Sequence, residues 1–114
     1  MTEPRLTAKI WSGAYIMRCQ AQAVTAMILR HGDDKAGIVL LKINSLGGGC
    51  TVYQPISDID GNREWLRATG SELVPETEAD AFIERQVSYD SDLWVIEVED
   101  RQCRHFLDEP VIDI

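Results

Sequence analysis

Apolar residues recur at two different spacings in this chain, and the order of the two spacings restricts the fold more than any other feature. Between residues 3 and 21 they recur every three or four positions, which predicts a helix. The expected apolar face of this helix contains Leu6, Ile10, Ala14, Met17 and Ala21. Trp11 and Tyr15 extend that face, and Thr2 is the candidate N-cap because its hydroxyl can accept a hydrogen bond from the first turn.

From Val24 the spacing changes to two, which is typical of strands. Four short stretches with this period follow, at residues 25–31, 38–43, 51–56 and 63–69. Turn residues such as those at 31–35, the glycines at 47–49 and the Asp60-Gly61 pair separate them. Because short turns join antiparallel neighbours, the four stretches are predicted to form an antiparallel meander.

A second helix and a fifth strand complete the pattern. Pro75 suits the first turn of a helix, and Glu76 and Glu78 favour the positive end of its dipole. Residues 93–99 then alternate as a strand. The predicted fold is α+β, with a mainly antiparallel sheet of about five strands and two helices on one face, in the order α-β-β-β-β-α-β. Residues 1–114 are expected to form a single globular domain, with 101–114 as a C-terminal tail.

The charge balance argues against two classes of partner. The chain has 11 Lys and Arg against 19 Asp and Glu, a net charge of −8 at pH 7. Nucleic acid and anionic membrane surfaces are themselves negative, so both are predicted not to be partners. The N-terminal residues lack the pattern of a signal peptide, and the apolar runs are too short to cross a bilayer.

The cysteines point to a reducing compartment. Cys19, Cys50 and Cys103 are odd in number and widely spaced, and they form no CxxC pair. The simplest interpretation of such a set is three reduced thiols, so we expect a cytoplasmic protein.

No motif predicts a metal, a cofactor or a catalytic residue. The acidic stretch from Asp58 to Glu64 is similar to a calcium loop, but the twelfth position is Thr69 where a bidentate Glu is needed. The glycines at 47–49 are not followed by a helix, as a phosphate-binding loop would require. Cys103 and His105 have no further ligands at a metal-site spacing.

The best candidate for partner binding is a stripe on the fourth strand. Arg63, Trp65 and Arg67 alternate there and would present an aromatic ring between two cations. The alternative is that the two arginines pair with Glu97 and Glu99 on an adjacent strand. His105 and Phe106 in the tail are the other expected partner-binding residues.

Three stretches resemble a known family: residues 64–70 (EWLRATG), 92–101 (DLWVIEVEDR) and 105–110 (HFLDEP). The chain is similar to short alphaproteobacterial proteins catalogued as a domain of unknown function, number fourteen ninety-one. The resemblance runs nearly end to end and implies a bacterial, cytoplasmic protein. It implies no reaction, ligand or partner.

Two hypotheses about function follow. The first is a small non-enzymatic module that binds another protein or itself, using the arginine stripe and the apolar, acidic tail. The alternative is a small-molecule or metal-dependent enzyme that uses acidic residues on the sheet, namely Asp58, Asp60, Glu97 and Glu99, or His105. The enzyme hypothesis requires these side chains to converge on one pocket.

Overall fold

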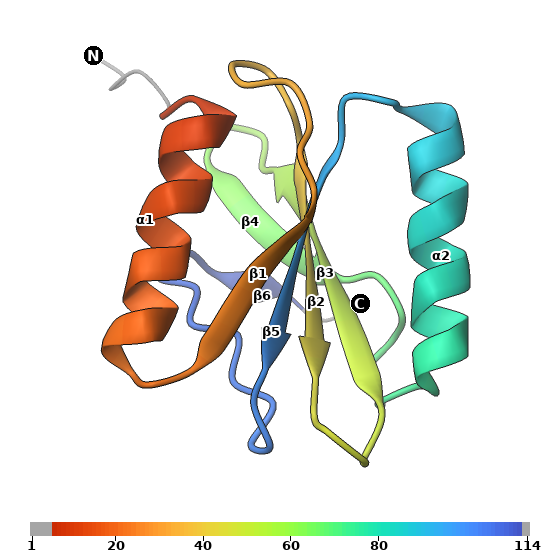
Figure 1. Cartoon of the computed structure of the whole chain (residues 1–114). Helices are drawn as coiled ribbons and strands as arrows, with labels where there is room; N and C mark the ends of the chain where they lie inside the picture. The colour runs from red at the N-terminus through yellow and green to blue at the C-terminus, as the bar shows by residue number, and fades with distance from the viewer. Residues whose placement is uncertain (1–5, 113–114) are drawn as a thin grey trace.

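The computed structural model describes residues 6–112, in which two helices and six strands follow one another. The helices are α1 (Ala8–Ala21) and α2 (Glu76–Tyr89). The strands are β1 (Thr25–Arg30), β2 (Val39–Asn44), β3 (Cys50–Ser57), β4 (Arg63–Arg67), β5 (Trp94–Glu99) and β6 (Val111–Ile112). They form one mixed sheet in the order β1-β5-β2-β3-β4-β6, with one helix on each side (Figure 1).

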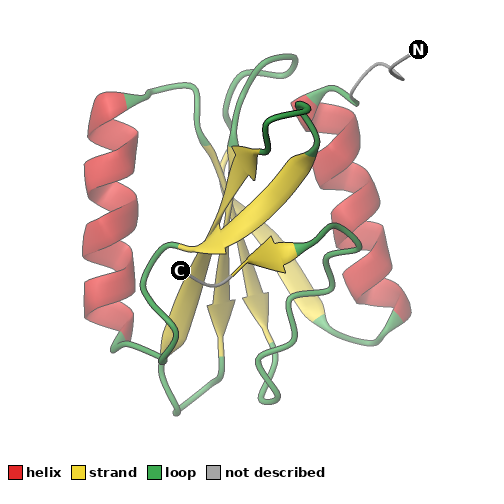
Figure 2. Ribbon diagram, turned by 180° about the vertical axis from the view of Figure 1, so that it is seen from behind, coloured by secondary structure: helices red, strands yellow, loops and turns green. Residues whose placement is uncertain are grey.

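The predicted sheet of about five mainly antiparallel strands, with both helices on one face, is wrong. Strands β2 and β5 pair in parallel, as do β4 and β6, and the helices cover opposite faces (Figure 2). The reason for two covered faces lies in β2, where side chains of both faces are buried. Leu41 belongs to the core under α1 and Leu40 to the core under α2. A strand that is apolar on both faces needs cover on both.

The expected meander is present only from β2 to β4, because β5 lies between β1 and β2. Residues Trp94 to Val98 of β5 are all buried, whereas β1 is largely exposed, so β5 takes a central position and β1 the edge. The segment after β1, predicted to be a hairpin turn, instead crosses the start of β5. There Trp94 donates its indole N–H to the Asp33 carbonyl (2.7 Å) and its backbone N–H to the Ile38 carbonyl (2.8 Å).

Helix α1 buries only the side of the expected apolar face that Trp11 and Tyr15 form. The residues that face the core are Ala8, Trp11, Ser12, Tyr15 and Cys19. The Trp11 ring stacks on Tyr15 (centroids 5.1 Å apart) and on Trp65 (5.4 Å), so the large aromatic area outweighs that of the aliphatic stripe. Thr7 caps the helix by accepting from the Ile10 N–H (3.3 Å); the candidate cap Thr2 lies outside the described residues.

The C-terminal segment completes the α1 side of the sheet. The hydroxyl of Tyr15 donates to the His105 carbonyl (2.6 Å), and Arg18 donates to the Phe106 carbonyl (2.6 Å). The chain then reaches β6, which pairs with β4 at the sheet edge. Residues 111–112 of the expected tail are therefore a strand of the sheet.

Candidate interaction site

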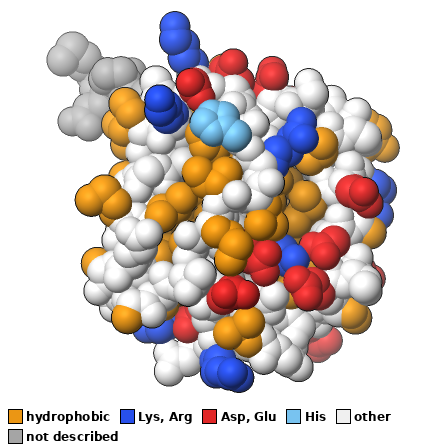
Figure 3. Space-filling model, in the orientation of Figure 1, with side chains coloured by type: hydrophobic (Ala, Val, Ile, Leu, Met, Phe, Trp, Pro, Cys, Tyr) orange, Lys and Arg blue, Asp and Glu red, His pale blue; other side chains and the backbone are white. Residues whose placement is uncertain are grey.

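The outward face of α1 is apolar. The residues on it, together with Leu6 just before the helix, are Leu6, Ile10, Gly13, Ala14 and Met17, and we call them the outer stripe. Leu6 is 55% exposed, Ile10 57% and Met17 69%. Hydrophobic side chains are accordingly visible along the α1 side of the molecule (Figure 3). Leu6, Ile10, Ala14 and Met17 belong to the face that the sequence predicts to be apolar, and the structure turns these four residues toward solvent.

The charges of α1 have one sign. The helix contains Lys9 and Arg18 and no acidic residue, although the whole chain has a net charge of −8. Arg18 also lies 3.4 Å from the Asp108 carboxylate. The outer stripe is therefore an apolar surface flanked by cations on an acidic protein.

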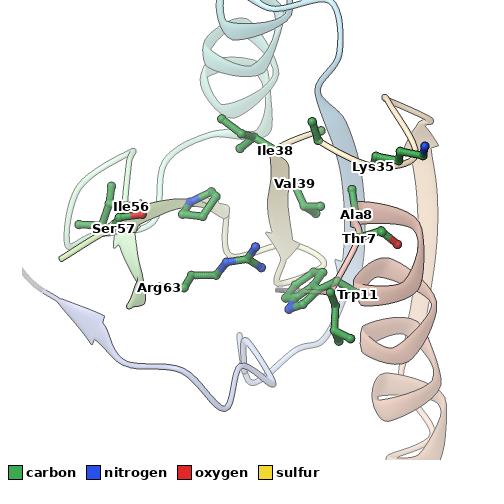
Figure 4. Close-up of a pocket in the computed structure, with 13 residues that line it drawn as sticks. Thr7, Ala8, Trp11, Lys35, Ile38, Val39, Ile56, Ser57 and Arg63 are labelled. Atoms are coloured by element: carbon green, nitrogen blue, oxygen red, sulfur yellow. The ribbon is translucent and has the colours of Figure 1, made fainter. Parts of the chain in front are cut away.

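A hollow lies beside the first turn of α1. It has a volume of about 400 Å³ and is lined by the start of α1, the segment before β2, and the facing ends of β3 and β4. Trp11 and Arg63 lie at its floor (Figure 4), and we call it the Arg63 hollow. A second hollow of about 680 Å³ adjoins it, shares Leu6, Trp11 and Arg63, and extends to Arg18 and the carboxylates of Asp60, Asp108 and Glu109.

Two tryptophans hold the guanidinium of Arg63. Its central carbon lies 5.6 Å from the Trp11 ring centroid and 5.9 Å from that of Trp65, both within the range of cation–π contacts. No carboxylate within residues 6–112 forms an ion pair with Arg63, although the side chain is half-buried. In the close-up, the guanidinium points toward Trp11, and the amine of Lys35 points away at the outer end of the hollow (Figure 4).

The other predicted partner-binding residues lie on the same face of the sheet. Trp65 is fully buried, and its indole N–H donates to the Glu109 carboxylate (2.9 Å). Arg67 lies over the Tyr53 ring (6.0 Å), and His105 meets that ring edge-on (5.4 Å). Phe106 packs against the α1-side core. The alternative pairing of the two arginines with Glu97 and Glu99 does not form, because β2 and β3 separate β4 from β5.

The residues of the enzyme hypothesis do not converge. Asp58 accepts from the backbone N–H groups of Asn62 (2.8 Å) and Asp60 (2.9 Å) within the β3–β4 turn, and these hydrogen bonds lower the pKa of its carboxyl. Glu97 lies on the α2 side of the sheet, and His105 lies on the α1 side. In the part of the chain that the structure describes, no three His, Cys, Asp or Glu side chains are grouped to hold a metal.

A charged cluster that the sequence analysis did not identify lies on the α2 side. The Lys42 ammonium donates to Glu76 (2.8 Å) and Asp80 (2.7 Å) on α2 and lies 3.7 Å from Glu97. Burial by itself lowers the pKa of Lys42, but the hydrogen bonds to Asp80 and Glu76 and the charge of Glu97 raise it overall. A permanently protonated amine is not a nucleophile, so this cluster attaches α2 to the sheet. Its one sequence signal was a lysine within a strand that is otherwise apolar on both faces.

Comparisons with known proteins agree with the fold. A family model described as "Protein of unknown function (DUF1491)" matches residues 6–108. A crystal structure of a DUF1491 family protein from Caulobacter crescentus CB15 is 37% identical, with a TM-score of 0.86 over 95% of this chain and 100% of that one. An NMR structure of a DUF1491 family protein from the same strain is also 37% identical, with a TM-score of 0.84 over 96% and 99%.

A third structure supports the fold alone. It is the solution structure of protein Atu0922 from A. tumefaciens, 24% identical, with a TM-score of 0.80 over 97% of this chain and 98% of that one. The chain has no match among curated proteins. Neither α1 nor α2, the helices within residues 6–112, is long and apolar enough to cross a membrane.

Proposed function

The chain belongs to the DUF1491 family, as its sequence resemblance predicted, and since that family is of unknown function we propose one: a non-enzymatic protein-interaction module. Its docking surface is the outer stripe of α1. The observation that carries the proposal is that α1 has two apolar faces and buries only one of them.

A helix that is apolar on all sides is normally covered on all sides. Here the core takes up the Trp11–Tyr15 face, and Ile10 and Met17 remain more than half exposed on the opposite face. Scattered exposed apolar residues need no explanation, but a continuous apolar surface with a polar rim marks an interaction site. Gly13 has open space around it, so a second backbone can approach closely at the middle of the stripe.

The proposed occupant is an acidic amphipathic helix of another protein. Lys9 and Arg18 flank the outer stripe, and acidic residues beside an apolar face would complement them. A second copy of this chain is disfavoured, because each copy has a net charge of −8 and two copies repel each other.

We place this activity in the cytoplasm and propose no nucleic acid or cofactor for it. Cys19, Cys50 and Cys103 are all free thiols, as a reducing compartment favours. The net charge of −8 opposes nucleic acid.

The test is a selection of helical peptides from a displayed random library on the wild-type chain. We expect peptides that combine Asp or Glu with an apolar face. The double variant Ile10→Glu, Met17→Glu should bind them at least about tenfold more weakly, since it places like charges in the stripe. Tyr89→Glu, at an exposed position of α2, is the matched control and should bind them as the wild type does.

Far-ultraviolet circular dichroism would establish that the double variant keeps its helices. Both substituted side chains point outward, so the fold should tolerate them. Peptides that bind the double variant as tightly as the wild type would refute the outer stripe as the docking surface.

A further inference from the structure

The Arg63 hollow is a second site, distinct in chemistry from the outer stripe. Its volume of about 400 Å³ lies within the range of small-ligand sites, about 300–1,000 Å³. Apolar groups such as Trp11, Val39 and Pro55 line it, and no Asp or Glu among residues 6–112 does. It is therefore apolar and positive on a protein that is acidic overall.

The guanidinium of Arg63 is positioned to bind an anion in this hollow. Arg18, Lys42 and Arg104 each pair with a carboxylate of the chain, whereas Arg63 rests on two tryptophan rings. A guanidinium whose face is covered by aromatic rings keeps its N–H groups at the edge of its plane, where they form a fork. Trp65 is fixed by its hydrogen bond to Glu109, so the support under Arg63 is itself positioned.

A carboxylate fits these features better than a phosphate. It is planar and takes two parallel hydrogen bonds from a guanidinium. Of the cations that line the hollow within the described residues, only Arg63 points into it, because Lys35 points outward beside Asp33 and Asp34 (Figure 4). A doubly charged phosphate would have one partner there and would meet the repulsion of the whole chain.

We propose that the Arg63 hollow binds a carboxylate that carries a small apolar group. The carboxylate pairs with the Arg63 guanidinium, and the apolar group contacts Trp11, Val39 and Pro55. Two sources have this chemistry, a free aliphatic acid and the apolar C-terminal residue of a peptide. The experiment below separates them.

The test is a titration followed by the backbone amide NMR signals of the ¹⁵N-labelled full chain. The probes are hexanoate for the free acid and N-acetyl-leucine for the peptide end, each compared with its own amide. Both acids should shift the signals of Trp11, Gly37 and Val39, and the amides should bind at least about tenfold more weakly, since a hydrogen bond to a charged group is lost. The acid with the higher affinity identifies the source.

Variants then assign the cation. Arg63→Gln should weaken the binding of both acids by at least about tenfold. Arg63→Lys should restore only part of that affinity, since an ammonium lacks the planar fork. Arg67→Gln is the matched control, two residues along the same strand and outside the hollow, and should leave binding unchanged. Because the acid-against-amide comparison uses the wild type, the proposal stays testable if Arg63→Gln does not fold.

Two results would overturn the proposal: equal affinity for an acid and its amide, or no saturable binding of either acid at millimolar concentration. Neither result would affect the outer stripe, whose test uses helical peptides and the Ile10 and Met17 positions. Likewise, failure of the helical-peptide test would not affect the proposal for the Arg63 hollow.

Discussion

Lys42 shows how one buried charge positions a helix. Its ammonium is almost fully buried in β2, yet it reaches Glu76 and Asp80 in the first two turns of α2. Asn44 adds a hydrogen bond to Glu97 (3.0 Å), the buried carboxylate of the cluster. The side chains of Glu76 and Asp80 are half exposed, so water can stabilise their charges without the lysine. The essential partner is therefore Glu97, whose buried carboxylate water cannot stabilise if the lysine is removed.

Replacement of Lys42 by Met is therefore expected to lower the free energy of unfolding by about 3 kcal/mol. Urea unfolding followed by tryptophan fluorescence measures the loss. In the Lys42→Met, Glu97→Gln double variant the loss should be smaller, because no unpaired charge remains buried. A loss below about 1 kcal/mol, typical of an exposed pair, would show that Glu97 is solvated in the variant.

His105 makes stability depend on pH. Its Nδ1 accepts from the Leu107 N–H (2.9 Å), which requires that nitrogen to be unprotonated. Burial lowers the pKa of His105, and the charge of Arg67 lowers it further. Since the unfolded pKa is about 6.5, the unfolded chain binds a proton below that pH that the folded chain does not. The stability contribution is thus complete above about pH 6.5 and is lost as the pH falls toward the folded pKa.

We expect the free energy of unfolding to decrease between about pH 7 and pH 5, and the decrease to be smaller in His105→Asn. Asparagine keeps an acceptor near the Leu107 N–H but does not titrate. Urea unfolding at several pH values gives both slopes. Equal slopes in the two proteins would mean that His105 has the same pKa in the folded and unfolded chain.

At the scale of elements, the sequence predicted what local patterns encode. Acids after Pro75 identified α2, whose apolar residues Ala79, Phe82, Ile83 and Val87 pack in the core beneath it. The glycines at 47–49 and the Asp60-Gly61 pair identified the turns of the β2–β3–β4 meander. The period of two also placed Arg63 and Trp65 on one face of β4, but nothing local placed Trp11 beside them.

The errors have a common physical cause, which is that contacts distant in the sequence decided between equivalent local patterns. Helix α1 is apolar on two faces, and contacts with residues distant in the sequence, such as the stack of Trp11 on Trp65, accompany burial of the Trp11 face. Likewise, β1 could pair with β2 or β5, and the turn residues between β1 and β2 suit a hairpin. The choice depends on β5, more than 60 residues after β1, whose start the segment between β1 and β2 crosses.

That crossing leads to a prediction about two glycines. A Cβ added to Gly32 would overlap the Asp92 carbonyl oxygen and lie 2.6 Å from a Trp94 ring carbon, so Gly32→Ala should destabilise by about 3 kcal/mol. Gly13 in α1 has nothing within 4 Å, so Gly13→Ala should stabilise by about 0.5–1 kcal/mol. Urea unfolding compares the two. A neutral Gly32→Ala would show that the segment between β1 and β2 has room to move away from β5.

At the scale of the whole molecule, charge and apolar surface are separated. The chain has a net charge of −8, yet the charged residues of α1 are all cations. The second apolar face of that helix is open to solvent. Two such molecules repel one another over distances comparable with the Debye length, about 8 Å at physiological salt.

The isolated chain is therefore expected to be monomeric at micromolar concentration and physiological salt, with a mass of 12.8 kDa in sedimentation velocity. High salt screens this repulsion and strengthens apolar contact, so any self-association should increase with salt and should be removed by Ile10→Glu, Met17→Glu. The Tyr89→Glu variant should behave as the wild type. A dimer at physiological salt that the double variant abolishes would make a second copy the occupant of the outer stripe, because the apolar contact would then exceed the repulsion between the two net charges.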